Sequence, residues 1–258
     1  MAIASQSLTG IRSRRLAVVA AGLAVAAPLA LLSFPTSAVP QRMIVVHGPD
    51  SSSHLRLTVV GSDIMVKGHL DHSGQIGCEP VGGPVIECPT AGAGSIEVDM
   101  GPQDDKVEVL DPLPIPLTAR LGSGSDKLIG NAEVDTCYPE GSKRNRCYGG
   151  GGNDICITGE QNSDCVGDGG DDYCRHGAGS DGCWGDFSPK PDDPRQGSPG
   201  NDVCYMGLGE DGCHGGPGDD RLYGEGGADQ LYGESGNDFC DGGPGVGRSH
   251  QCESGPGH

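Results

Sequence analysis

The clearest pattern of apolar and polar positions in this chain is a nine-residue repeat across residues 197–241. Five units follow one another without a gap: GSPGNDVCY, MGLGEDGCH, GGPGDDRLY, GEGGADQLY and GESGNDFCD. In every unit position 4 is Gly, position 6 is Asp, and position 8 is the apolar residue Cys or Leu. A fixed period of this kind predicts a repeat architecture in which each unit stacks on its neighbours.

The same period begins earlier, at residue 121, with the units LGSGSDKLI, GNAEVDTCY, GGGGNDICI, GDGGDDYCR and HGAGSDGCW. The units at 139–148 and 158–166 depart from it, so metal sites that involve them are in doubt. Residues 185–196 contain three Pro and are expected to loop outward. The last unit, GGPGVGRSH, has Gly247 where the other units have Asp. It therefore lacks the carboxylate that could bind a metal ion, and metal binding should stop at this unit.

In a three-residue strand, position 8 points inward while positions 7 and 9 point outward. Two units then make one turn of a flattened right-handed coil, so the predicted fold is an all-β, parallel β-roll over 121–241. Residues 39–120 read as short strands, at 43–47, 55–60 and 63–67, broken by turns, and contain a degenerate unit at 101–107. We expect this β-rich segment to cap one end of the roll and residues 242–258 to cap the other.

The repeat places hard oxygen ligands at a fixed spacing. Gly at positions 1, 2 and 4 allows backbone conformations that aim carbonyl groups inward, and the Asp at position 6 adds a carboxylate. Carbonyl and carboxylate oxygens without sulfur or imidazole suit calcium. Asp residues stacked at the strand spacing of about 4.8 Å repel one another, so the stack should be loose without metal.

These units resemble the hemolysin-type, or RTX, calcium-binding repeat GGxGxDxUx, over roughly half of the chain. The resemblance implies a parallel β-roll that holds several calcium ions between successive glycine-rich turns. A Gly/Asp-rich linker is the alternative, but linkers need no fixed period. Carried over unit by unit, the implied ligands are Asp126, Asp135, Asp154, Asp172, Asp181, Asp202, Asp211, Asp220, Asp229 and Asp238, assisted at position 5 by Asn153, Asp171, Asn201, Asp219 and Asn237.

Residues 1–38 are predicted to be a signal peptide. Arg12, Arg14 and Arg15 precede an apolar run at 16–32, and small residues end at a predicted cleavage site after Ala38. An uncleaved membrane anchor is the alternative. General secretion is favoured over twin-arginine export because Ala17 and Val18 follow the arginine pair. The mature protein is therefore expected to be extracellular or associated with the cell wall, and free of the membrane.

Charge and composition limit the possible partners. Removing residues 1–38, which carry three Arg and no acid, changes the net charge from −19 to −22, and nucleic acid is then a poor partner. With 47 Gly and few aromatic residues, an ordinary globular core is not expected. Metal ions and covalent links must therefore supply stability.

Twelve Cys after an export signal predict disulfides. Cys78–Cys88 and Cys240–Cys252 would close local loops. Most of the others occupy position 8, where the RTX family usually has Leu, Ile or Val. Two pairings stay open, with the first favoured. Bridges across the roll would be Cys137–Cys147, Cys156–Cys165, Cys174–Cys183 and Cys204–Cys213, and bridges along each sheet would be Cys137–Cys156, Cys174–Cys204, Cys147–Cys165 and Cys183–Cys213.

The expected function is that of a calcium-binding structural or adhesive module that acts as a monomer. Position 9 also carries an outward aromatic row, read mainly as stacking between neighbouring turns and alternatively as a platform for cell-wall polymer or glycan. This aromatic row comprises Tyr138, Tyr148, Trp184, Tyr205, Tyr223 and Tyr232.

No metalloprotease, nucleophile-elbow or P-loop motif is present, so the chain is predicted not to be an enzyme. His69 and His72 beside Asp71 are interpreted as a solvated turn rather than a metal site.

Overall fold

The computed structural model describes residues 42–70, 75–131, 133–141, 143–186, 198–245 and 247–255. The predicted signal peptide, Asp71 and His72, and most of the loop at 185–196 lie outside the described residues. The description below concerns the unit Val39–His258 alone. No helix among the described residues is long and apolar enough to cross a bilayer.

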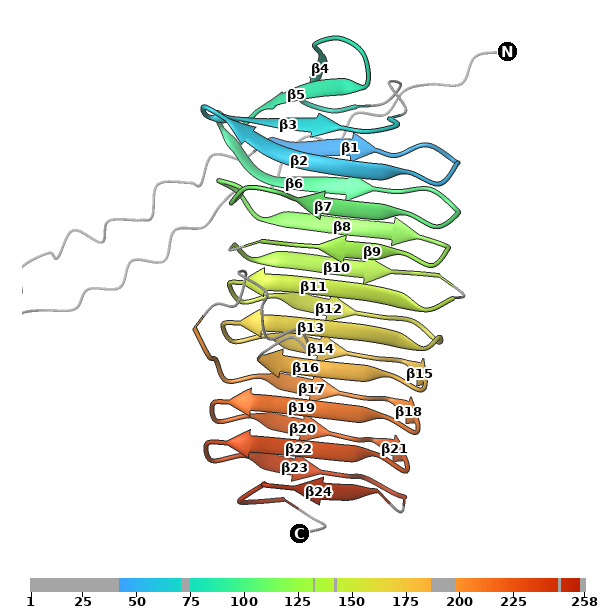
Figure 1. Cartoon of the computed structure of the whole chain (residues 1–258), viewed down its shortest axis with the longest axis vertical. Helices are drawn as coiled ribbons and strands as arrows, with labels where there is room; N and C mark the ends of the chain where they lie inside the picture. Colours follow the sequence, from blue (N-terminus) through green and yellow to red (C-terminus); the bar gives the residue numbers. More distant parts are fainter. Residues whose placement is uncertain are drawn as a thin grey trace, which may run out of the picture. The chain divides into compact units, whose positions relative to one another are not determined.

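The described chain winds back and forth between two large sheets (Figure 1). One sheet has nine strands, all paired in parallel. Its order is β1 (Arg42–His47), β6 (Ala93–Asp99), β8 (Leu117–Gly122), β10 (Asp135–Pro139), β12 (Ile155–Ile157), β14 (Tyr173–Arg175), β17 (Val203–Tyr205), β20 (Arg221–Tyr223) and β23 (Phe239–Asp241).

The second sheet has twelve strands, parallel except at one end, where β2–β3, β3–β5 and β4–β5 pair antiparallel. Its order is β24 (Arg248–His250), β22 (Gln230–Ser235), β19 (Gly212–Pro217), β16 (Gly182–Asp186), β13 (Ser163–Gly169), β11 (Asn145–Gly151), β9 (Lys127–Ile129), β7 (Lys106–Val109), β2 (His54–Val60), β3 (Asp63–Lys67), β5 (Val85–Pro89) and β4 (Glu79–Pro80).

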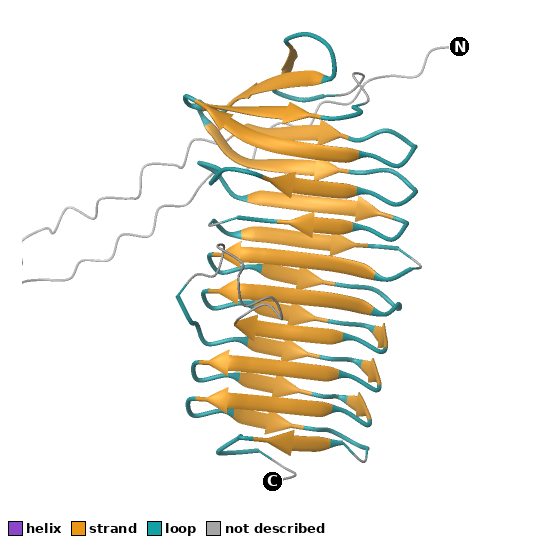
Figure 2. Cartoon of the chain, viewed as in Figure 1, coloured by secondary structure: helices purple, strands orange, loops and turns teal. Residues whose placement is uncertain are grey.

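Strands of the two sheets run in opposite directions, because the chain crosses from one sheet to the other at each glycine-rich turn (Figure 2). A third, three-stranded sheet runs along one edge of the roll. It is formed by β15 (Ala178–Gly179), β18 (Leu208–Gly209) and β21 (Gly226–Gly227). The predicted all-β parallel roll is confirmed.

The roll extends further toward the N-terminus than the repeat pattern indicates. Strands β1, β6 and β8 continue the nine-stranded sheet, while β2 and β7 continue the twelve-stranded sheet. The sheets show no break at the boundary expected at residue 120. Within 39–120, the part that departs from the parallel roll is the group β3, β4 and β5, which extends the twelve-stranded sheet past β2 by antiparallel pairing.

The core between the sheets consists of two facing columns of buried residues. Parallel pairing at constant register places each position-8 residue directly over the next. In the nine-stranded sheet the column is Val46, Val98, Ala119, Cys137, Cys156, Cys174, Cys204, Leu222 and Cys240. In the other sheet it is Leu55, Val107, Leu128, Cys147, Cys165, Cys183, Cys213 and Leu231.

The disulfides cross the roll, as the favoured pairing predicts, but not at every expected position. Cys137–Cys147 and Cys156–Cys165 join the two columns with Cα atoms 6.2 Å apart, and the end loops close through Cys78–Cys88 and Cys240–Cys252. Such a distance lies within the range that a disulfide spans, and well below the 10 Å typical of packed sheets. A core of small Cys side chains lets the sheets approach this closely.

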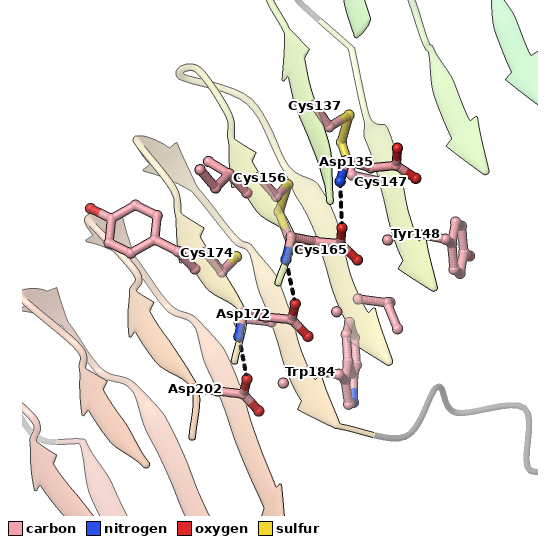
Figure 3. A pocket seen from close by; sticks show the side chains of 18 of the residues that line it. Asp135, Cys137, Cys147, Tyr148, Cys156, Cys165, Asp172, Cys174, Trp184 and Asp202 are labelled. Carbon is pink, nitrogen blue, oxygen red and sulfur yellow. Dashed lines mark hydrogen bonds between the residues drawn. A yellow bond between two sulfur atoms is a disulfide. The ribbon is translucent and has the colours of Figure 1, made fainter. Parts of the chain in front are cut away.

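The other two expected crosslinks, Cys174–Cys183 and Cys204–Cys213, are absent, and all four cysteines are buried free thiols. The expectation of a continuous series of crossing bridges is therefore wrong in this part of the core. Cysteine also fills the space incompletely, because a cavity of about 20 Å³ lies among the cysteines of the central turns (Figure 3).

Aromatic side chains on the outer faces stack along the roll. Tyr205 and Tyr223 stack with ring centroids 4.6 Å apart. On the other sheet, His214 and Tyr232 stack at 4.5 Å, with Trp184 on the far side of His214 at 6.1 Å. These contacts use the flat faces of the rings, as the stacking interpretation of the row expects. Tyr138 and Tyr148 instead lie against the cations of Arg120 and Lys127.

The glycine at position 4 is required by close approach between successive turns. Gly236 has a φ of 152°, and a Cβ added there would overlap the carbonyl oxygen of Gly218 in the turn stacked on it. Backbone atoms cannot move aside in the way that the end of a flexible side chain can. The glycine spacing therefore sets how tightly the turns stack.

We predict that Gly236→Ala lowers the free energy of unfolding by more than about 3 kcal/mol, because it combines backbone overlap with a strained φ. Gly212→Ala is the matched control, since a Cβ there meets no atom within 4 Å and its φ is not in the left-handed region. The control should change stability by no more than about 0.5 kcal/mol. Urea denaturation in saturating calcium measures both, and equal effects of the two substitutions would refute the role of close stacking.

Candidate metal centre

The predicted position-6 aspartates form a continuous ladder along one edge of the roll. Each Asp lies where a strand of the nine-stranded sheet begins. From Asp135 to Asp220, the backbone N–H of each residue donates a hydrogen bond to Oδ1 of the next Asp, one turn further along. The donor–acceptor distances are 2.6–2.9 Å. Figure 3 shows part of this series, through Asp135, Asp172 and Asp202. The full ladder is Asp135, Asp154, Asp172, Asp202, Asp220 and Asp238.

A second ladder, formed at the strands of the twelve-stranded sheet, is interrupted. Asp181, Asp211 and Asp229 are linked in the same way, at 2.8 and 3.1 Å. Toward the N-terminus, the equivalent positions are Ser163 and Asn145. The backbone N–H of Ser163 donates to Asp181, and the side-chain oxygen of Asn145 accepts from the N–H of Asp126 at 2.8 Å. Neutral side chains thus replace the carboxylates in the two units that depart from the repeat. This edge offers anionic ligands in two separate groups.

The second oxygen of these carboxylates is buried without a hydrogen-bond partner. This holds for every predicted position-6 Asp except Asp135, whose Oδ2 accepts from the N–H of Asn131 at 3.0 Å. A buried carboxylate oxygen with no partner costs stability unless a cation compensates it. The unpartnered oxygens belong to Asp126, Asp154, Asp172, Asp181, Asp202, Asp211, Asp220, Asp229 and Asp238.

Backbone carbonyl groups converge on the same oxygens at the position-1 glycines. A Cβ added to Gly224 would lie 2.6 Å from Asp229 Oδ2 and 3.0 Å from the carbonyl oxygen of Gly242. Likewise, a Cβ on Gly185 would meet both Asp202 Oδ2 and the carbonyl oxygen of Gly215. Carboxylate and carbonyl oxygens around a space that glycine keeps open form a ligand set of the kind that calcium prefers. The residues present therefore fit calcium.

The position-5 residues form a separate, exposed ladder and do not join the carboxylates of position 6. Here the backbone N–H donates in the opposite direction along the roll, to the side chain one turn earlier, at 2.7–3.2 Å. One side-chain oxygen of each residue except Asn237 accepts this hydrogen bond, which indicates a role in fastening the turns. The members are Asn153, Asp171, Asn201, Asp219 and Asn237.

Four acidic residues that the candidate ligand set omits also lie at these edges. Asp105 begins the second ladder, with its N–H donating to Asp126, and Glu253 ends the first by accepting from the N–H of Asp238 at 2.7 Å. Asp168 and Asp186 are buried at position 2, where most units have Gly, and pair with each other across β13 and β16. Asp105 was recognisable from its degenerate unit, whereas Glu253 lies outside any repeat.

Burial raises the pKa values of the ladder carboxyl groups. Loss of solvation is the largest cause, and neighbouring carboxylates add to it. The pKa rises to about 7 for Asp135, about 8 for Asp154, and about 9 for Asp172 and Asp202. Without a cation, these groups hold protons near neutral pH. Calcium and protons therefore compete for the same oxygens.

From these pKa values we predict opposite pH dependences with and without calcium. A raised folded-state pKa contributes stability that is complete below the unfolded value near 3.8 and is lost as pH rises through about 7–9. In chelator, thermal stability should therefore fall between pH 5 and 8. The slope is about 1.4 kcal/mol per pH unit for each proton by which the folded and unfolded chains differ.

In saturating calcium the stability should instead rise over the same interval, because protons no longer displace the ion. Differential scanning calorimetry at both conditions measures the two trends. Parallel trends in calcium and in chelator would contradict metal binding at the ladder carboxylates.

Comparison with known proteins agrees with this geometry. A family model described as the RTX calcium-binding nonapeptide repeat, in four copies, matches residues 143–164 and 214–247. No curated protein and no solved structure matches the chain. The matched stretches fall within the roll, and the second includes Asp220, Asp229 and Asp238 of the two ladders. The chain thus contains RTX calcium-binding nonapeptide repeats, and its described residues fold as a parallel β-solenoid with Cys-rich units.

Proposed function

We propose that this chain is a secreted structural or adhesive module whose roll becomes fully ordered when several calcium ions bind along its two edges. The observation that carries the proposal is the row of buried carboxylate oxygens without hydrogen-bond partners. Neutralising such a row requires either protons or cations, and the extracellular space that the predicted signal peptide implies is rich in calcium. The mature chain would act there as a monomer, outside the membrane.

Disulfides and calcium would stabilise different parts of the roll. Crosslinks at Cys78–Cys88, Cys137–Cys147, Cys156–Cys165 and Cys240–Cys252 all lie toward the ends or the first half of the roll. Between Cys165 and Cys240 the roll carries no crosslink among the described residues. This second half carries four carboxylates of the continuous first ladder and the longer group of the interrupted second ladder, and it should depend most on calcium.

A structural role also accounts for the acidic and aromatic residues. The paired acids, which could otherwise act in acid–base catalysis, are engaged in ladder hydrogen bonds, and this supports the proposal that the chain is not an enzyme. Glycan binding by the aromatic row stays a second prediction. The ring faces that would receive a sugar are used in contacts between neighbouring turns, such as Tyr205 on Tyr223.

We predict that adding calcium to a chelated sample increases the β signal in circular dichroism and reduces the hydrodynamic radius. Four disulfides hold part of the roll without metal, so the change should be smaller than for an uncrosslinked roll. Magnesium at the same concentration is the control, since it prefers rigid octahedral sites with retained water. Isothermal titration gives the number of ions, and a spectrum unmoved by millimolar calcium would refute ion-driven ordering.

We further predict that Asp220→Asn separates the two roles of a ladder carboxylate. The amide oxygen can still accept the hydrogen bond from the N–H of Asp202, as Asn145 does for Asp126. The anionic ligand, however, is lost. Calcium affinity at this edge should fall at least about tenfold, while stability in chelator at pH 8 should not fall.

Asp219→Asn is the matched control, with the same change of charge at an exposed neighbour whose side chain accepts from the N–H of Asn237. Its calcium affinity should stay within about threefold of the unmodified chain, or roughly 0.7 kcal/mol. Equal losses for the two variants would show that net charge, rather than the ladder, governs binding.

A further inference from the structure

The four free cysteines form a compact cluster of sulfur atoms in the core. Cys174 and Cys204 are neighbours in one column, and Cys183 and Cys213 are neighbours in the facing column. All four are buried, with exposed fractions of 6% or less. The cluster lies between the bridged pair Cys156–Cys165 and the facing leucines Leu222 and Leu231.

Three of the four sulfur atoms are close enough to share one ion, whereas Cys174 Sγ lies within 4.8 Å of the sulfur atoms of Cys156 and Cys165. The Sγ atoms of Cys183, Cys204 and Cys213 all lie within 4.8 Å of one another. Sulfurs bound to one tetrahedral zinc ion at about 2.3 Å are roughly 3.8 Å apart. Small side-chain movements would bring these thiolates to that geometry.

Two further ligand-type side chains adjoin the thiols, at positions where most repeat units have Gly. His176 and Met206 occupy position 1 of their units, and both are buried, with 3% and 0% of their surface exposed. His176 Nε2 lies 3.1 Å from Cys174 Sγ, and Met206 Sδ lies 3.0 Å from Cys204 Sγ. His and Met thus replace the usual glycine at two positions that adjoin unbridged cysteines.

The histidine ring is held in place by its other nitrogen. His176 Nδ1 shares a hydrogen bond with Thr158 Oγ1 at 2.9 Å, and Asp181 Oδ1 lies 3.8 Å away. Metal-binding histidines are oriented by such contacts to the nitrogen that does not bind the ion. The contact of Nδ1 with Thr158 directs Nε2 toward Cys174 Sγ.

We propose that Cys174, Cys183, Cys204 and Cys213, supported by His176 and Met206, form a buried site for one soft cation, Zn²⁺ or Cu⁺. Thiolate, thioether and imidazole ligands select such ions, whereas the ladder edges offer oxygen ligands alone. The site is therefore separate from the calcium ladders in both position and chemistry. Each thiol that binds the ion releases a proton, and the bound ion protects the thiolates from oxidation.

The experiment is performed on the purified full chain without added reductant. Denaturation in iodoacetamide followed by peptide mapping should show alkylation at the four cluster cysteines and at no other cysteine. Elemental analysis should give about one zinc or copper ion per chain, and the dominant metal distinguishes the two ions. X-ray absorption should show sulfur neighbours at about 2.3 Å for zinc.

Cys183→Val is the test variant, because an apolar residue at position 8 is usual for the repeat and preserves folding. It should lose at least about 100-fold in affinity for the soft ion, while its calcium titration stays unchanged. A Cys78→Ala, Cys88→Ala double variant is the control that should retain the ion. An unchanged calcium titration in Cys183→Val keeps failure of this site distinct from failure of the calcium proposal.

Two outcomes would overturn the proposal. One is a native chain in which the cluster cysteines resist alkylation and the mass corresponds to two more disulfides, Cys174–Cys183 and Cys204–Cys213. The other is four free thiols that bind neither Zn²⁺ nor Cu⁺ when these ions are supplied under anaerobic conditions.

Discussion

The structure depends on one interaction, the hydrogen bond from the backbone N–H of each ladder residue to the carboxylate of the residue one turn further along. It uses one carboxylate oxygen to hold successive turns in register and leaves the other buried and unpartnered. At the strand spacing, two such charges repel by on the order of 3 kcal/mol if the effective dielectric constant is about 20. The contact that aligns the turns therefore also creates the demand for cations.

Much of this arrangement could be predicted from the sequence, because a fixed period converts directly into columns of equivalent residues. Asp202 and Asp220 stand 18 residues apart, and two units per turn bring them together. The direction of the ladder hydrogen bonds could not be predicted in this way. It depends on where each backbone N–H points at a glycine-rich turn, and composition does not specify that. The position-5 residues illustrate the difference, since they repeat as regularly but bond in the opposite direction.

Parts of the roll and of its ladders lie outside the period of the repeat. Strands β1 and β2 belong to the roll because their apolar residues pair in register with β6 and β7, although no Gly or Asp pattern marks them. Glu253 extends a ladder from outside the repeats because the chain end folds back beside Asp238. In both cases tertiary pairing, rather than the local motif, supplies the missing neighbour.

The core shows how the same fold tolerates different means of stabilisation at one position. Position 8 holds a bridged cysteine, a free cysteine or a leucine at successive turns without a change of register. Leucine fills the core by volume, while a disulfide draws the sheets to a Cα separation of 6.2 Å. Free thiols do neither, so the turns around Cys183 have the weakest support from the core itself. Those turns also carry the added His176 and Met206 side chains, and their edges carry Asp172, Asp181, Asp202 and Asp211. The ladder carboxylates at the edges and the His176 and Met206 side chains in the core therefore lie in the same turns. These are the turns that apolar burial and disulfides stabilise least.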